Sequence, residues 1–290
     1  MSKALISVLA GLGGMVGWGT SDFFANLSSE KVGHFKTFLW SQVVGVFVFL
    51  LTLVLVRPDF SFTPVLILLL IVAAFGYGLG YLFFYRAFEI GNVSVVSGVI
   101  NVGTIFAMGV AFFVFGQRLD LIQIIGVLMV IIGATLVAIN PSDLFGGKVS
   151  LANGARESFI ASILFGLFYW PVNEYITERS HWLSTSIVIK FLSLVIVLLI
   201  AFWQKRDIKM KNVSKKIWVF VLLVGILEAL GVLATSFGVS VGDSILIAPI
   251  ASALAIVTII LAIIFLKEKV GRLRWLGIVM TIGGIILTAF

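Results

Sequence analysis

The chain has 290 residues, of which 61 % are hydrophobic and 11 % are charged. A typical soluble domain has about a quarter of charged residues, so this composition excludes a water-soluble globule and predicts a membrane protein. At roughly 20 residues for each spanning helix, the chain provides about ten spans and leaves no room for an attached ATPase domain. The absence of cysteine excludes disulfides, thiolate metal sites and a cysteine nucleophile.

The formal net charge of +7 comes from Lys and Arg residues in short loops between the apolar segments. This distribution indicates orientation in the membrane rather than a nucleic-acid partner.

Apolar runs separated by Gly, Pro and charged residues predict the spans in chain order. The first half, 1–139, contains spans at 4–26, 37–56, 64–88, 94–115 and 121–139. A polar linker over 140–157 follows, and the second half, 158–290, contains spans at 158–177, 182–203, 217–239, 244–266 and 273–290. The predicted fold class is therefore an all-α integral membrane protein with ten transmembrane helices. We expect the first span to be retained, because its apolar run is too long for a secretory signal.

An even number of spans puts both termini on one side of the membrane. Lys and Arg in short loops resist translocation, so the side that holds most of them is cytoplasmic. The loops on the side of the termini contain Lys3, Arg57, Arg118 and Arg179, whereas the opposite loops contain fifteen such residues, six of them between 205 and 216. This predicts non-cytoplasmic termini, and we expect the protein to lie in the plasma membrane. The basic run itself is explained by topology, with contact to anionic lipid headgroups as a second interpretation.

The two halves resemble each other when they are aligned. A shift of 151 residues places Gly80 on Gly231 and Gly126 on Gly277, and a shift of 152 places Trp18 on Trp170. Because each half has an odd number of spans, the second half enters the membrane in the opposite direction. The sequence thus predicts a 5+5 inverted repeat, an arrangement typical of secondary transporters with a binding site between the halves.

Several short segments carry a resemblance to a known family. They are WGTSDFF at 18–24, FGQRL at 115–119, API at 248–250 and LKEKV at 266–270. With these segments in this order, the chain resembles the EamA-type transporters of the drug/metabolite transporter superfamily. The resemblance implies a substrate carrier that is not an enzyme, but the family covers amino acids, sugars, nucleotide-linked metabolites and drugs, so it does not give the substrate. The first half departs from the family pattern at Gln117, where the second half has Glu268.

Ionisable residues inside spans are costly and are candidates for a functional site. The repeat pairs Asp22 with Glu174, Gln42 with Lys190, Tyr77 with Glu228 and Asn101 with Ser252, and we expect these residues to line one central cavity. Aromatic side chains could enclose an amphipathic metabolite there, although packing and lipid contact are the alternative explanation. The candidate binding residues are Trp18, Asp22, Gln42, Tyr77, Tyr81, Asn101, Tyr169, Trp170, Asn173, Glu174, Lys190, Glu228 and Ser252.

Individual residues allow more than one role. Lys190 either forms an internal salt bridge with Glu174 or Glu228, or anchors a carboxylate or phosphate of the substrate. Glu228 is the candidate proton carrier, because burial and a nearby lysine act in opposite directions on its protonation. Asp22 and Glu174 could instead hydrogen-bond helix ends near the membrane interface.

The leading hypothesis is a secondary transporter, monomeric or homodimeric, that binds a small polar or amphipathic metabolite and alternates access to it, with possible drug efflux and proton coupling. We expect no cofactor and no metal, because His34 and His181 lie at turns without a ligand cluster. Two rival functions are an integral-membrane enzyme that acts on a lipid-linked substrate and a channel. Pro171 and Pro249 fall inside spans, where each is expected to kink its helix and to shape the cavity.

Overall fold

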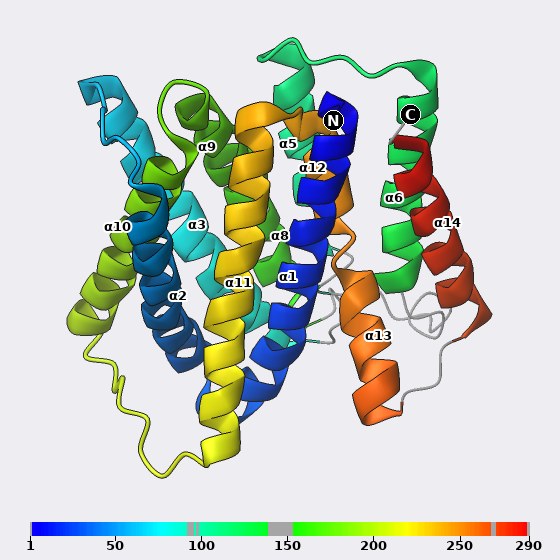
Figure 1. The fold of residues 1–290 in the computed structure, drawn as a ribbon. Helices are drawn as coiled ribbons and strands as arrows, with labels where there is room; N and C mark the ends of the chain where they lie inside the picture. The colour runs from blue at the N-terminus through cyan, green and yellow to red at the C-terminus, as the bar shows by residue number, and fades with distance from the viewer. Residues whose placement is uncertain (1, 92–95, 97–98, 139–152, 268–270, 289–290) are drawn as a thin grey trace.

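The structure, a computed structural model, describes residues 2–91, 96, 99–138, 153–267 and 271–288. Within these ranges the secondary structure is helical (Figure 1). The first half contains α1 (Lys3–Val32), α2 (His34–Val56), α3 (Pro64–Ile90), α5 (Val102–Phe113) and α6 (Leu121–Ala138). The second half contains α8 (Ala155–Ile163), η1 (Leu164–Tyr169), α9 (Trp170–Thr177), α10 (Trp182–Trp203), α11 (Lys215–Val241), α12 (Ser244–Ser252), α13 (Ala255–Leu266) and α14 (Arg272–Thr288).

The helices follow the predicted spans, and seven of them are long and apolar enough to cross a membrane by length and composition. Three shorter apolar helices occupy the remaining spans, at Val102–Phe113, Leu121–Leu136 and Trp275–Thr288. The prediction of a multi-pass, all-α membrane protein is thus confirmed.

The sixth span starts three residues earlier than predicted, inside the polar linker. Gly154 precedes α8 with a φ of 86°, and Glu157 lies in the first helical turn. A carboxylate is favourable at that position, because the amino-terminal end of a helix carries a partial positive charge. The part of the linker at 140–152 lies outside the described residues.

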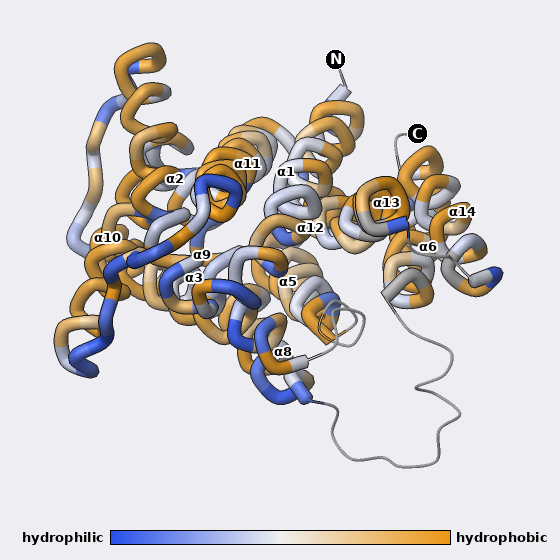
Figure 2. Tube along the Cα trace, turned by 90° about the horizontal axis from the view of Figure 1, so that it is seen from below, coloured by the Kyte–Doolittle hydropathy of each residue, from blue (hydrophilic) through white to orange (hydrophobic). Residues whose placement is uncertain are grey.

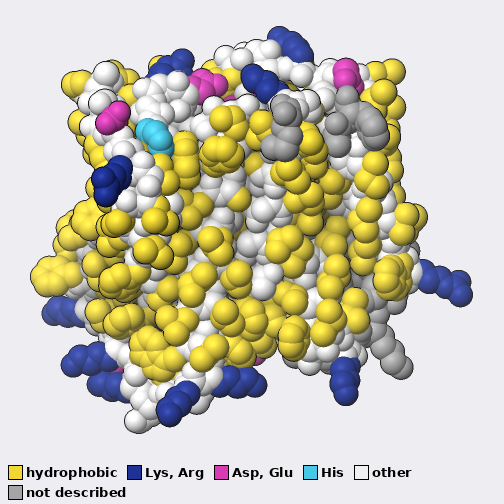
Figure 3. Space-filling view, in the orientation of Figure 1, with side chains coloured by type: hydrophobic (Ala, Val, Ile, Leu, Met, Phe, Trp, Pro, Cys, Tyr) yellow, Lys and Arg dark blue, Asp and Glu magenta, His cyan; other side chains and the backbone are white. Residues whose placement is uncertain are grey.

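The outer surface agrees with a location in the bilayer. Hydrophobic side chains cover the middle of the face in Figure 3, and Lys and Arg gather at its lower edge. On α2, for example, Phe47, Leu51 and Leu55 point outward with more than half of their surface exposed. The amino-terminal end of α1 and the carboxyl-terminal end of α14 lie at the same, upper end of the molecule in Figure 1.

Small residues bring the helices close together. The α6–α14 pair lies at one side of the molecule, across from α2 and α10 (Figure 2). In this pair a Cβ added at Gly284 would lie 2.5 Å from the carbonyl oxygen of Gly126. At the α1–α11 crossing, a Cβ added at Gly17 would lie 2.9 Å from Gly231 Cα. Such contacts are the usual basis of helix packing in membranes, where lipid removes the hydrophobic drive for association.

Two of the spans are interrupted near a proline, as predicted. The sixth span changes from α-helix to the π-helical turn η1 directly before α9, which has Pro171 in its first turn. The ninth span contains Pro249 inside α12 and breaks between Ser252 and Ala255. Proline lacks the backbone N–H that continues a helix, and π-helical turns are frequent at functional sites. Both interruptions border the same cavity.

Candidate functional site

A cavity of about 110 Å³ lies between α1, α3 and α5 on one side and η1, α9 and α12 on the other. The π-helical turn contributes Phe165 and Tyr169 to its wall, and the break after α12 contributes Leu254. The irregular segments thus expose side chains that a continuous helix would place elsewhere. Seven of the predicted binding residues line this cavity: Trp18, Asp22, Tyr81, Asn101, Tyr169, Trp170 and Ser252.

Aromatic rings form most of the cavity wall. Trp18 and Trp170 meet edge to face with their ring centroids 6.0 Å apart. Tyr81 packs edge to face on Phe165, with the centroids 5.0 Å apart. Aromatic walls provide a large apolar contact area, and their faces attract the positive charge of a ligand.

The cavity wall also contains buried polar groups without hydrogen-bond partners among the described residues. Asp22 is 3 % exposed, and among the described residues its Oδ2 atom has no hydrogen-bond partner. The same holds for the amide nitrogen of Asn101, which is 6 % exposed. Because buried polar groups are nearly always hydrogen-bonded, these atoms are suited to a bound molecule or water that brings the missing partners. The indole nitrogens of Trp18 and Trp170, which also line the cavity, have no partner among the described residues either. The cavity therefore offers a ligand one such acceptor and three such donors.

Close backbone contact joins α5 to α8 and η1 beside the cavity. A Cβ added at Gly103 on α5 would lie 2.8 Å from the carbonyl oxygen of Ser162 on α8. Gly166 in η1 faces the backbone of Gly103 in turn. The absence of side chains at both positions lets α5 pack closely against α8 and η1.

A second buried cluster joins three predicted residues from different helices. Lys190 on α10 pairs with Glu228 on α11, and the two side chains are 2 % and 1 % exposed. Lys190 Nζ also donates to the hydroxyl oxygen of Tyr77 on α3 at 2.8 Å, and the Tyr77 hydroxyl donates to Glu228. Of the two partners predicted for an internal salt bridge of Lys190, the structure thus selects Glu228.

One aromatic layer separates this cluster from the cavity. The ring of Tyr77 packs against Tyr81 at 4.9 Å and against Tyr169 at 5.0 Å between centroids. Both of these tyrosines line the cavity, whereas Tyr77, Lys190 and Glu228 do not. The Tyr77 ring therefore lies between the ion pair and two tyrosines of the cavity wall.

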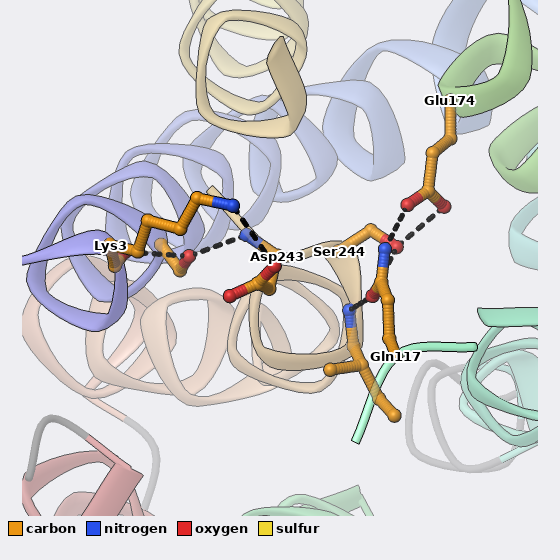
Figure 4. A network of polar contacts seen from close by, with 7 residues as sticks. Lys3, Gln117, Glu174, Asp243 and Ser244 are labelled. Atoms are coloured by element: carbon orange, nitrogen blue, oxygen red, sulfur yellow. Dashed lines mark hydrogen bonds and ion pairs between the residues drawn. The ribbon is translucent and has the colours of Figure 1, made fainter. Parts of the chain in front are cut away.

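Glu174 belongs to a third group, at the end of the molecule where the chain begins (Figure 4). Its carboxylate accepts from Gln117 Nε2 and from Ser244 Oγ, each at 2.5 Å. Gln117 Oε1 in turn accepts the backbone N–H of Ile245 at 2.9 Å. The network joins α9, the segment after α5 and the first turn of α12, so it closes this end between both halves.

A neighbouring contact ties α1 to the same place. Ser7 Oγ accepts the backbone N–H of Asp243 at 2.9 Å, and Lys3 Nζ lies 3.9 Å from the Asp243 carboxylate (Figure 4).

The remaining predicted residues are buried but lie apart from these groups. Gln42 on α2 is fully buried, and neither of its amide atoms has a partner among the described residues. It lies one turn before Gly45, against which the Lys190 side chain packs. Asn173 on α9 is 5 % exposed and does not line the cavity.

Sequence reasoning missed several residues of the site. Phe165 and Leu254 line the cavity without being among the predicted binding residues. Gln117 was noted only as a departure from a family pattern, and Ser244 only as the start of a span. The one available signal for Ser244 was its position at the start of a span, directly after Gly242 and Asp243.

Comparisons with known proteins agree with this architecture. The sequence profile of the EamA-like transporter family matches residues 5–139 and 157–290. A solved crystal structure, described only as that of a protein, superposes with a TM-score of 0.76 at 14 % identity, over 97 % of this chain and 96 % of its own. At this identity the likeness shows the fold alone. The comparison with curated proteins gives no match.

Proposed function

From the premise that this chain belongs to the EamA-like transporter family, whose members are membrane transporters, we propose a secondary carrier for a small polar or amphipathic metabolite. Candidate substrates are amino acids, sugar-like molecules or drugs, moved across the plasma membrane by a monomer or homodimer. The observation that carries the proposal is the aromatic cavity between the two interrupted spans. Its wall contains Asp22, whose Oδ2 atom has no hydrogen-bond partner in the described part of the chain.

An inverted repeat of residues 1–139 and 158–290, joined by the linker 140–157, is supported by the helix contacts. The first span packs against α11 in the second half, and the sixth span packs against α3 in the first half. The helix pairs α2–α10 and α6–α14 each join counterparts from the two halves. Two residue pairs that the repeat aligns, Trp18 with Trp170 and Tyr77 with Glu228, are in contact. Contacts between counterparts are expected around a twofold axis.

Alternating access would open and close the two ends of the cavity in turn. The Glu174 network bridges Gln117 of the first half and Ser244 of the second half, so opening of this end requires its hydrogen bonds to break. We infer that this network is the gate on the side of the termini. The concentration of Lys and Arg at the opposite end supports termini outside the cytoplasm.

Proton coupling is assigned to Glu228, which lies in the buried cluster rather than in the cavity. In this proposal the protonation state of Glu228 changes its bonds to Lys190 and Tyr77, and the Tyr77 ring transmits the change to Tyr81 and Tyr169. Replacing Glu228 with Gln should then flatten the pH dependence of uptake into proteoliposomes. Unchanged pH-dependent flux in this variant would exclude Glu228 as the coupling group.

The absence of cysteine makes accessibility a direct test of the carrier mechanism. In a Ser252→Cys variant, a membrane-impermeant thiol reagent should reach the cavity from either side, and a transported substrate should slow the labelling. A second variant that adds a Gln117→Cys/Ser244→Cys pair should lose labelling from the side of the termini after cross-linking. Labelling from one side only, unaffected by cross-linking, would contradict alternating access.

A ligand screen addresses the substrate. The purified protein is heated with pools of amino acids, sugars, nucleosides and cationic drugs, and one pool should raise its unfolding temperature. A ligand at 100 times its dissociation constant should raise the free energy of unfolding by about 2.7 kcal/mol. The Asp22→Asn variant should lose this shift while it keeps the unfolding temperature of the ligand-free protein. Full retention of the shift would remove Asp22 from the binding site.

A further inference from the structure

A large groove lies at the end of the molecule opposite the termini. It has a volume of about 960 Å³ and runs between the ends of α1 and α13, the first turn of α2, the beginning of α11 and the segment that precedes α11. Among the described residues, Glu30 is the only acidic residue of its lining. Five lysines also line it: Lys31, Lys36, Lys209, Lys211 and Lys216. The groove is therefore strongly basic.

Polarity changes along the groove in the direction of the membrane normal. On α1 the lining residues begin with Phe23 and Phe24 and end with Lys31, a rise of about 12 Å at 1.5 Å per residue. On α11 the lysine again lies at the end of the helix and the aromatic residue deeper. Lys216 is at the helix start, and Phe220 follows one turn later. The deep wall is aromatic: Phe24 lies 5.2 Å from Phe220 between ring centroids. The groove thus has a cationic mouth at the interface and an apolar interior.

The segment that carries two of the lysines is fixed in place by α2. Trp40 Nε1 donates to the carbonyl oxygen of Ile208 at 2.9 Å, and Lys36 Nζ donates to that of Lys209 at 3.1 Å. Asp207 lies 3.9 Å from Lys36 and 4.0 Å from Lys211. The backbone N–H of Lys209, together with these lysines, holds the pKa of Asp207 below its ordinary value, so this carboxylate stays ionised.

Three of the lining lysines, Lys31, Lys209 and Lys216, are exposed and form no ion pair among the described residues. Lys216 Nζ lies 5.6 Å from the centroid of the Phe220 ring, which leaves Lys31 and Lys209 for a ligand. These two come from different parts of the groove lining, α1 and the segment before α11.

We propose that this groove binds an anionic phospholipid, with its phosphate between Lys31 and Lys209 and an acyl chain against Phe23, Phe24 and Phe265. A soluble anion would satisfy the lysines but leave the aromatic interior uncovered. Phe265, which lies 6.1 Å from Phe23 between ring centroids, is 65 % exposed on the outer surface, where the acyl chain would cover it. Such a lipid binds through two interactions: attraction of its headgroup to lysines at the membrane surface, and apolar contact of its acyl chain below that surface.

The position of the groove also links it to the cavity. Asp22 lines the cavity, and the next two residues of α1 line the groove. A lipid in the groove would therefore contact the turn of α1 that carries Asp22. Binding itself does not depend on the transport proposal and is measured without a substrate.

The test compares phosphatidylglycerol with phosphatidylcholine as ligands of the purified full chain, by native mass spectrometry and thermal unfolding in detergent. We expect selective, saturable binding of phosphatidylglycerol to the parent protein. A Lys31→Gln/Lys209→Gln variant should bind it roughly 30-fold more weakly, at about fivefold for each lysine, which corresponds to about 1 kcal/mol each. The matched control is Lys215→Gln/Lys267→Gln, which loses the same charge at the same end but outside the groove lining; it should bind within about fivefold of the parent.

Three results would overturn the proposal. Equal weakening in both double variants would indicate only nonspecific attraction to the basic end. Competition by inorganic phosphate as effective as that by phosphatidylglycerol would indicate a site for a soluble anion. Formation of a dimer that protects Lys31 and Lys209 from amine-reactive reagents in the absence of lipid would indicate that a second copy covers the groove.

Discussion

The buried Lys190–Glu228 pair allows a quantitative prediction. Replacing Lys190 with Met removes the cation and leaves the Glu228 carboxylate in a place where the two side chains are 2 % and 1 % exposed. Water screens almost none of the resulting loss, so we expect a destabilisation of about 3–5 kcal/mol, the range for breaking a buried ion pair by removing one partner. The Tyr77 hydroxyl still donates to Glu228, which places the effect at the lower part of that range.

Removing both charges should cost less than the sum of the single changes. In a Lys190→Met/Glu228→Gln variant, no charge remains buried in the cluster, and the glutamine amide still offers an oxygen to Tyr77. Replacement of a whole buried pair is often neutral or even stabilising. The double-mutant cycle should therefore give a coupling energy of about 2–3 kcal/mol.

Thermal unfolding in detergent, followed by the fluorescence of the seven tryptophans, measures these differences. At about 2–4 °C for each kcal/mol, the Lys190→Met variant should unfold roughly 6–20 °C below the parent. Lys215→Met, at an exposed lysine in the first turn of α11, is the control and should have no effect beyond about 0.5 kcal/mol. An unfolding temperature of Lys190→Met equal to that of the control, or additivity in the double variant, would refute the charge-pair argument.

Three further predictions concern packing and gating. Gly103→Ala should destabilise the protein by about 1–3 kcal/mol, because its Cβ meets a backbone oxygen at 2.8 Å, whereas Gly109→Ala on the same helix has open space and should be neutral or slightly stabilising. On α14, Gly284→Ala meets the backbone of α6 at 2.5 Å and should lower the unfolding temperature, but the neighbouring Gly283→Ala meets only a flexible methionine end and should not. Equal unfolding temperatures within either glycine pair would contradict the helix packing. Glu174→Ala should open the end of the termini, which increases the labelling rate of Ser252→Cys from that side; an unchanged rate would show that this network is no gate.

Much of the fold followed from the sequence because membrane spans are strongly marked. Apolar runs such as 182–203 ended at charged or polar residues, and the helix α10 has the same bounds. Polar helix ends were less visible: α1 continues through a polar stretch to Val32 and ends at Gly33, whose φ of 87° favours glycine. Helical hydrogen bonds also form between polar residues, so hydropathy underestimates the length of such a helix.

Sequence reasoning identified residues of the candidate site but not their separation into distinct groups. Intramembrane charge identified Asp22, Lys190 and Glu228 as unusual residues. Distances between helices cannot be obtained from hydropathy and spacing, so all candidates were expected around one cavity. Tertiary packing instead puts the Tyr77 ring between the Lys190–Glu228 pair and the cavity.

By itself, the amino-acid sequence determined that this protein lies in a membrane, where most of its apolar helices run, and which side chains are too polar for lipid. These properties depend on each segment and its solvent alone. Only the tertiary structure decided which polar groups satisfy one another and which stay unpaired. Glu228 finds Lys190 and Glu174 finds Ser244, whereas Asp22 keeps an unpaired oxygen in the cavity. The partners of these two carboxylates come from other helices, and the approach of helices is set by small residues such as Gly103, whose contacts no single segment encodes.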